Sequence, residues 1–142
     1  MKISIGSDHR GFELKSKIVE NFKNIEWIDV GTHAGATTRV NYPMFAQKVC
    51  KNILENKSEL GVLICGSGVG IAVAANRFKK IYAGLCWNKD VAKVAKEHDN
   101  INVLVLPADF VNESQAFDII NAWLSSEFKS GIYKERLNSI DL

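Results

Sequence analysis

The sequence predicts an α/β fold in which helices cover both faces of a five-stranded parallel sheet. Strand-like and helix-like hydrophobic patterns alternate along the 142 residues, and such alternation is typical of βαβ units with right-handed crossovers. The segment 60–65 is apolar without interruption, as expected of a strand that is buried on both faces. No internal repeat or linker divides the chain, so we expect residues 1–142 to form one domain.

The first part of the chain contains two predicted strands and two predicted helices. Residues 3–6 form a short apolar run that is typical of a strand, and residues 25–30 are expected to form a second strand, closed by Gly31. The first helix is expected over residues 11–23, with one apolar face formed by Leu14, Ile18, Val19 and Phe22. A loop over residues 32–41 leads to Pro43, which suits the first turn of a helix. The apolar stripe of this second helix consists of Phe45, Ala46, Val49, Cys50, Ile53 and Leu54.

The second part adds two strands and three helices to the predicted strand at 60–65. Strands are expected at residues 81–87 and 102–106, with a helix over 88–97 between them. Asn112 and Gln115 have the spacing of a capping box, and the helix after them carries Ala116, Phe117, Ile120, Trp123 and Leu124. A last short amphipathic pattern uses Tyr133, Leu137 and Ile140. Its apolar stripe could pack on its own domain or on a second subunit, and both interpretations stay open.

Composition and charge argue against several classes of protein. The formal net charge is +2 and the lysines are scattered, so we expect no nucleic-acid partner. No apolar span of about 18 residues is present, and Asp8–Arg10 interrupts the N-terminal segment, so neither a membrane span nor a signal peptide is expected. The three cysteines are far apart, which indicates neither disulfides nor a metal site. We expect reduced thiols in a cytoplasmic protein, with Cys50 and Cys86 packed in the core.

The segment 60–77, LGVLICGSGVGIAVAANR, is the most informative part of the chain. Gly66, Gly68 and Gly70 alternate between the apolar strand and a helix of small residues. Such a loop exposes backbone N–H groups and the positive end of a helix dipole, which favours the binding of an anion. Cys65 stands at the mouth of this loop, where we expect its thiolate to be favoured. The alternatives are a purely structural turn and a buried core cysteine.

Polar residues also follow the first and second strands, at the edge where parallel sheets bind ligands. Asp8 could be a helix N-cap, whereas His9 beside it is harder to explain by capping and could bind an anion. His98 follows the fourth predicted helix and is expected at the opposite edge of the sheet. Considered alone, His98 is a histidine at the C-terminus of a helix, a position that the helix dipole favours. It could act in catalysis only if another subunit brought it to the crevice.

Four linked segments resemble the type B ribose-5-phosphate isomerases, a family that also includes the galactose-6-phosphate isomerase subunits. They are SDHRGFELK at 7–15, NYP at 41–43, ICGSGVGIAVAANR at 64–77 and EHDNINVL at 97–104. The resemblance spans nearly the whole chain in order. It implies a Rossmann-like three-layer α/β/α sandwich with an extra C-terminal helix, no metal or cofactor, and a homodimer or tetramer with shared active sites. The implied reaction interconverts ribose 5-phosphate and ribulose 5-phosphate through an enediolate.

The resemblance also implies a role for each matching residue. Cys65 corresponds to the base that moves a proton between C2 and C1 of the open-chain sugar. Ser67 and the loop amides match an anion hole for the enediolate oxygen, formed at Gly66, Gly68, Val69 and Gly70. His98 matches the residue that opens the sugar ring in a neighbouring subunit. The implied substrate-binding residues are Asp8 and Tyr42 for hydroxyl groups, His9 and Arg136 for the phosphate, and Asp99 beside His98.

Three positions depart from the family pattern. Asp99 stands where the family usually has asparagine, and Asp109 and Ile132 stand where it has arginines. The loss of two charge-assisted phosphate contacts would cost about 1.5–3 kcal/mol each without a replacement. Arg10 and Arg39, both beside crevice loops, are the candidate replacements. These departures leave two alternatives open: an isomerase of a six-carbon sugar phosphate, and a non-catalytic phosphosugar-binding module.

Overall fold

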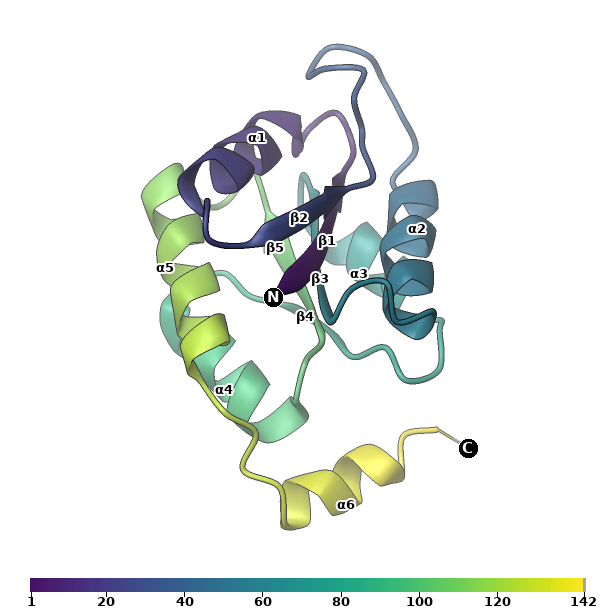
Figure 1. Ribbon diagram of the computed structural model, residues 1–142, viewed down its shortest axis with the longest axis vertical. Coiled ribbons are helices and arrows are strands. Elements are labelled where there is room, and N and C mark those ends of the chain that lie inside the picture. The colour runs from purple at the N-terminus through teal and green to yellow at the C-terminus, as the bar shows by residue number, and fades with distance from the viewer. Residues whose placement is uncertain (142) are drawn as a thin grey trace.

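The computed structural model describes residues 1–141 and contains a five-stranded parallel sheet with helices on both faces (Figure 1). The strand order is β2-β1-β3-β5-β4. The strands are β1 (Lys2–Ser7), β2 (Glu26–Asp29), β3 (Leu60–Cys65), β4 (Ala83–Leu85) and β5 (Val103–Pro107). The helices are α1 (Phe12–Asn21), α2 (Pro43–Leu54), α3 (Val69–Ala75), α4 (Lys89–Asp99), α5 (Glu113–Ser125) and α6 (Ile132–Asn138). The predicted α/β fold is thus confirmed. None of the helices within residues 1–141 has the length and apolar character needed to cross a bilayer.

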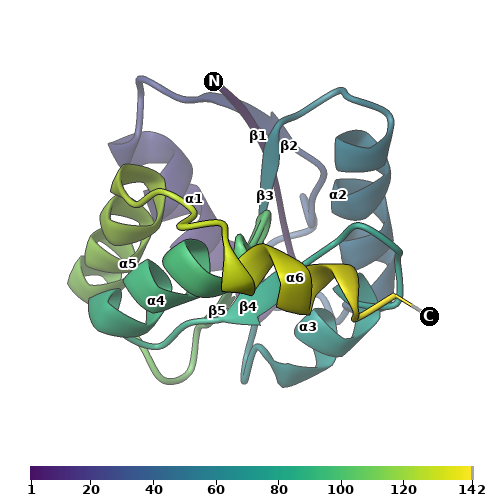
Figure 2. The same ribbon diagram turned by 90° about the horizontal axis from the view of Figure 1, so that it is seen from below.

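Two apolar clusters fill the layers on the opposite faces of the sheet. Helices α1, α4 and α5 cover one face, and α2 and α3 cover the other (Figure 2). The central strand β3 feeds both clusters, because successive side chains of a strand point to opposite faces. Val62 and Ile64 belong to the first cluster, whereas Leu63 and Cys65 belong to the second. The unbroken apolar run of this segment is therefore explained by its burial on both faces of the sheet.

The edge strand β4 is shorter than predicted, at Ala83–Leu85 instead of residues 81–87. At the start of this strand, two asparagine side chains form hydrogen bonds with backbone groups. The Asn76 side chain accepts a hydrogen bond from the Ala83 N–H at 2.8 Å and donates to the Ala83 C=O at 2.9 Å. The Asn102 side chain accepts from the Tyr82 N–H at 2.8 Å. The Tyr82 N–H is satisfied by the Asn102 side chain, and the ladder with β5 begins at Ala83, later than the hydrophobic pattern does.

Short loops bring the carboxyl ends of β1, β3 and β5 together. The Asp8 N–H donates to the Ile64 C=O at 3.3 Å, which joins the end of β1 to the end of β3. On the other side, the Ala108 N–H donates to the Cys65 C=O and the Asp109 N–H donates to the Gly66 C=O, both at 2.9 Å. The chain leaves β1 for β2 by α1, then returns to β3 by α2 on the other face. Such a switch in direction is where parallel α/β sheets bind ligands.

The start of α5 and the position of α6 bear on two of the predictions. Asn112 and Gln115 form the predicted capping box at the start of α5. Helix α6 runs beneath the sheet, beside the C-terminal end of α4, as the view from below shows (Figure 2). Its Leu137 is buried against its own chain, whereas Ile132 and Ile140 are exposed. The apolar stripe of α6 is therefore divided between its own domain and solvent.

Candidate active site

Cys65 ends the central strand β3, and its side chain lies at the base of the glycine-rich loop. The residue is 5% exposed and pairs in register with Pro107 of β5. The backbone amides of Ile71, Gly68 and Ser67 face its sulfur and act to lower the pKa of the thiol. The thiol therefore lies within an array of main-chain donors at the ligand-binding edge of the sheet, as the sequence predicted.

The pKa of the Cys65 thiol is nevertheless raised above its ordinary value of 9.0. Burial is the largest cause, because a thiolate loses more hydration than a thiol when it leaves water. The Asp8 carboxylate adds to the rise, while the amides of Ile71, Gly68 and Ser67 lower the pKa without offsetting the burial. The prediction of a favoured thiolate is therefore wrong for the unliganded chain.

Gly68 has a backbone conformation that a larger residue would not tolerate. Its φ of +75° lies in the left-handed region that favours glycine. An added Cβ would also lie 2.4 Å from Cδ1 of Leu85. Within the same turn, the Val69 N–H donates to Oγ of Ser67 at 3.2 Å. The turn that presents amides to the Cys65 sulfur thus depends on a glycine at this position.

Gly66 and Gly70 make room for three neighbouring loops. A Cβ at Gly66 would lie 2.7 Å from Nε of Arg10 and 2.8 Å from Oδ2 of Asp109. A Cβ at Gly70 would lie 2.7 Å from Cζ of Tyr42. The absence of side chains here lets residues that follow β1, β2 and β5 approach the glycine loop. Three of the predicted crevice segments are therefore brought together.

The loop after β1 serves both the helix that follows and the crevice. Oδ1 of the buried Asp8 accepts hydrogen bonds from the N–H groups of Arg10 at 2.9 Å and Gly11 at 3.1 Å. This carboxylate therefore closes the turn that precedes α1, but it is not the helix N-cap, which is Gly11 without a side-chain cap. Asp8 also acts electrostatically on Cys65, which keeps it in the site. Nδ1 of His9 accepts from the Val40 N–H at 3.3 Å and joins this loop to the one after β2.

An ion pair crosses the crevice above Gly66. The Arg10 guanidinium binds the Asp109 carboxylate, and both side chains are partly exposed to solvent. The resemblance implies an arginine at position 109, so the positive charge here comes from position 10 and is paired with a carboxylate. The other candidate replacement, Arg39, is exposed in the loop after β2.

His98 lies outside this crevice, as predicted. Helix α4 starts after the carboxyl end of β4 and runs back to the amino end of β5, so His98 near its end lies at the opposite edge of the sheet. Its ring stacks on Tyr133 of α6, with centroids 4.2 Å apart and an interplanar angle of 6°. The Arg136 guanidinium lies 5.8 Å from the centroid of the same Tyr133 ring. Asp99 is exposed beside His98.

The predicted site residues thus form two separate groups. We call the first the crevice group, which consists of Asp8, His9, Arg10, Tyr42, Cys65 and residues 66–70. The second is the helix group, which consists of His98, Asp99, Tyr133 and Arg136. Each group holds side chains that the resemblance assigns to one active site. One chain therefore places the two parts of that site at opposite edges of its sheet.

Two residues of this region were not identified as site residues from the sequence. Tyr133 was assigned only to an apolar stripe, although its spacing of three residues from Arg136 places both on one helical face. Lys15 is buried and hydrogen-bonded to the base of the loop after β2. A lysine in an amphipathic helix does not indicate burial, so the sequence does not predict this contact. Across residues 1–141, no three or more His, Cys, Asp or Glu side chains gather in a way that could hold a metal ion.

Comparison with known proteins gives one family over nearly the whole chain. The sequence pattern of the Ribose/Galactose Isomerase family matches residues 3–140. Ribose-5-phosphate isomerase B of Escherichia coli (strain K12) is 36% identical over 141 residues, which cover 98% of this chain and 93% of that protein. A crystal structure of a ribose 5-phosphate isomerase from Thermotoga maritima has a TM-score of 0.95 at 42% identity, covering 99% of this chain and 97% of the other. The Mycoplasma genitalium ribose-5-phosphate isomerase B with bound ribulose-5-phosphate has a TM-score of 0.92 at 37% identity, with 98% and 93% covered.

The raised pKa of Cys65 can be measured by titrating the ultraviolet absorbance of its thiolate. We expect the difference between the wild type and Cys65→Ser to rise with a midpoint above pH 9.0, because burial outweighs the amide donors. Cys50 and Cys86 are present in both proteins, and burial raises the pKa of each to about 12, so their signals cancel. A midpoint below 9.0 would show that the amide donors prevail.

Proposed function

This chain is a member of the ribose/galactose isomerase family, and we propose that it interconverts ribose 5-phosphate and ribulose 5-phosphate. The observation that carries the proposal is the Cys65 thiol, held among main-chain donors at the ligand-binding edge of the sheet. A five-carbon substrate is supported by the relative from M. genitalium, whose structure holds ribulose-5-phosphate. The likeness covers the whole crevice, because it spans 98% of this chain.

The proposed chemistry is a proton transfer between neighbouring carbons. The Cys65 thiolate removes the proton from C2 of the open-chain aldose, and the electrons of the C2–H bond form the C1–C2 double bond of an enediolate. The negative charge on O1 is met by Ser67 and the loop amides, which are fixed before the reaction begins. The proton on O2 passes to O1, and the Cys65 thiol returns its proton to C1. A base with a raised pKa takes a carbon-bound proton more readily, but few molecules carry it in the basic form at neutral pH, so kcat/KM should rise with pH.

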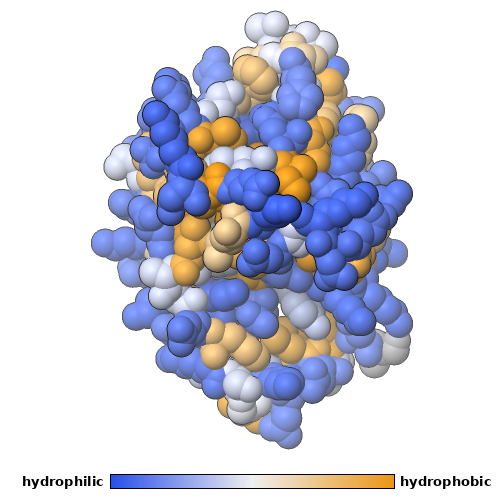
Figure 3. All heavy atoms as spheres, in the orientation of Figure 1, coloured by the Kyte–Doolittle hydropathy of each residue, from blue (hydrophilic) through white to orange (hydrophobic). Residues whose placement is uncertain are grey.

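We propose that two copies of the chain complete each site. The crevice group and the helix group lie at opposite edges of one sheet, so a crevice can meet a helix group only from a second chain. Apolar surface suited to such an interface lies around α6 at the lower end of the molecule (Figure 3), in a groove lined by Phe78, Ile81, Tyr82, Leu137 and Ile140. Val69 and Val73 of α3 are also exposed. These surfaces support a homodimer or a tetramer built from such dimers.

Phosphate binding is proposed to use cations from both groups. Arg136 comes from the helix group, and His9 and Arg10 come from the crevice group. Arg39 lies exposed in the loop that His9 contacts through Val40. Arg10 and Arg39 then replace the two arginines that the family has at positions 109 and 132. Because Asp109 already pairs with Arg10, an incoming phosphate would compete with that carboxylate.

We further propose that the protein acts in the cytoplasm without a metal or a redox cofactor. Its three cysteines are free thiols, as is usual in a reducing compartment. The overall reaction moves a proton between two carbons and leaves the sugar's net oxidation state unchanged. The loop amides provide the donors for the enediolate charge, so the chain holds the groups that this chemistry needs.

Replacing Cys65 tests the proposed base. We expect Cys65→Ser to lower kcat for ribose 5-phosphate by about 10²- to 10⁴-fold, the usual contribution of a general base. In D₂O the wild type should introduce deuterium at C1 of ribulose 5-phosphate, and the variant should not. Cys50→Ser is the matched control, since Cys50 is a core thiol and its loss should leave the exchange intact. Near-normal turnover by Cys65→Ser would disprove its role, and a wild type with neither turnover nor exchange would indicate a binding module.

Mixed dimers test the shared site. Cys65→Ala supplies an intact helix group, and His98→Asn supplies an intact crevice, so each heterodimer contains one complete site. Random reassortment of the two inactive variants in equal amounts should restore about one quarter of the wild-type turnover of ribose 5-phosphate. Heterodimers that form but remain inactive would show that each site is built within one chain.

Removing Arg10 tests the phosphate contact. We expect Arg10→Met to raise KM for ribose 5-phosphate about tenfold with kcat little changed, because a charge-assisted contact to a part of the substrate that does not react is lost. Lys23→Met removes the same charge at the far end of α1 and should leave KM unchanged. Equal KM values for the two variants would exclude Arg10 from the phosphate site. Repeating the comparison with a six-carbon sugar phosphate shows whether kcat/KM favours the five-carbon substrate.

A further inference from the structure

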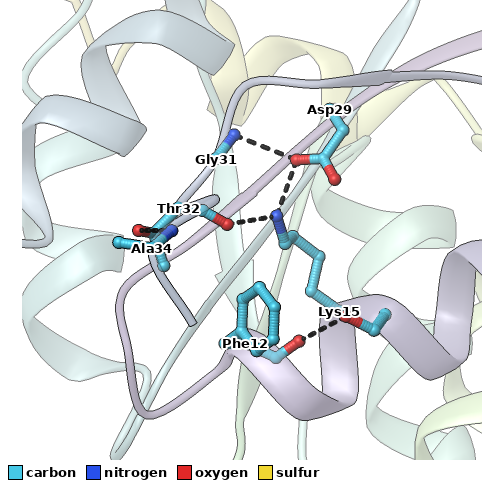
Figure 4. Close-up of polar contacts among 7 residues, drawn as sticks. Phe12, Lys15, Asp29, Gly31, Thr32 and Ala34 are labelled. Carbon is cyan, nitrogen blue, oxygen red and sulfur yellow. Dashed lines mark hydrogen bonds and ion pairs between the residues drawn. The ribbon is translucent and has the colours of Figure 1, made fainter. Parts of the chain in front are cut away.

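Lys15 is a charged side chain inside the protein. The residue lies on α1 and is 1% exposed. Its Nζ donates to Oδ1 of Asp29 at 2.7 Å and to the C=O of Thr32 at 2.8 Å (Figure 4). A buried ammonium group is costly unless it is paired and hydrogen-bonded. Asp29 and Thr32 provide this pairing and hydrogen bonding, at the point where β2 ends and the long loop of the crevice begins.

The base of that loop is fully hydrogen-bonded at Gly31 and Thr32. The Gly31 N–H donates to Oδ1 of Asp29 at 2.9 Å, and the Gly31 C=O accepts from the Ser7 N–H at 2.8 Å. The Thr32 N–H donates to the Ser7 C=O at 2.7 Å, and the Thr32 C=O accepts from Lys15. Of the N–H and C=O groups of Gly31 and Thr32, the Thr32 C=O is the one whose partner is Lys15. Thr32 is 3% exposed, so bulk water cannot simply take the place of the lysine.

This base sets the position of two parts of the crevice group. Ser7, to which it is bonded, immediately precedes Asp8 and His9. The loop beyond it covers residues 33–41, returns to His9 through the Val40 N–H, and ends at Tyr42 beside Gly70. Lys15 itself contacts Asp29, Thr32 and the ring of Phe12, whose centroid lies 5.6 Å from Nζ. It can therefore influence the crevice only through the backbone that it holds.

We propose that Lys15 is a positioning residue for substrate binding, because it fixes the base of loop 33–41 and thereby the placement of His9 and Tyr42. The substrate part of this inference rests on the proposed isomerase activity. The loop part does not, since the position of the loop can be measured without substrate. Loss of Lys15 should weaken the binding of the sugar phosphate and leave the proton transfer at Cys65 largely intact.

The experiment compares Lys15→Met with Lys17→Met. Lys17 lies on the same helix with 55% of its side chain exposed, so the control removes the same charge without touching the loop. Native trypsin digestion reports on the loop, because the exposed Arg39 lies within it. For Lys15→Met we expect cleavage after Arg39 to be at least about fivefold faster than in the wild type and the control. We also expect KM for ribose 5-phosphate to rise about fivefold or more, with kcat within about twofold.

Asp29→Ala provides a second variant in case Lys15→Met does not fold. The Asp29 side chain is 32% exposed, so its removal leaves a site that water can enter, while the bond to Gly31 is lost. It should change cleavage and KM in the same direction. Wild-type cleavage rates after Arg39, or an unchanged KM, in folded variants would overturn the proposal. If the wild type does not isomerise ribose 5-phosphate, the proposed function fails, and the trypsin result alone decides whether Lys15 holds the loop.

Discussion

The pairing of β3 with β1 on one side and β5 on the other determines where every crevice residue lies. Because β3 is central, its carboxyl end is surrounded by the turns that leave the two neighbouring strands. The hydrogen bonds from Asp8 to Ile64 and from Asp109 to Gly66 tie these turns to the glycine loop. A shift of β3 by one residue would turn Cys65 to the opposite face of the sheet. The position of the Cys65 thiol therefore depends on the register of the central strand.

The environment of Cys65 combines two opposing effects. The same burial that aligns the thiol with the amides of Ser67, Gly68 and Ile71 also removes the water that would stabilise its anion. Burial consequently favours the protonated thiol, which lies beside main-chain donors that are fixed in position. A substrate that carries its own developing charge would use those donors in place of the thiolate.

Much of the fold was predictable because its signals are local. The apolar run at β3 and the capping box at Asn112 each follow from a few adjacent residues. The division of the site into two groups could also be anticipated, since His98 follows a helix that leads away from the crevice. The pKa of Cys65 was predicted in the wrong direction, because a sequence shows a helix N-terminus but not the extent of burial. The role of Lys15 depends on contacts with Asp29 and Thr32 across the fold, which no spacing reveals.

The way in which β4 ends the sheet limits how copies of this protein can associate. Edge strands with free backbone groups invite another chain to extend the sheet. Here the Asn76 side chain occupies both the N–H and the C=O of Ala83, which is the first residue of the edge strand. A neighbouring strand would have to displace that amide before it could add to the sheet. A contact between copies on this side would consequently rest on side chains, because extending the sheet would first require the loss of these two hydrogen bonds.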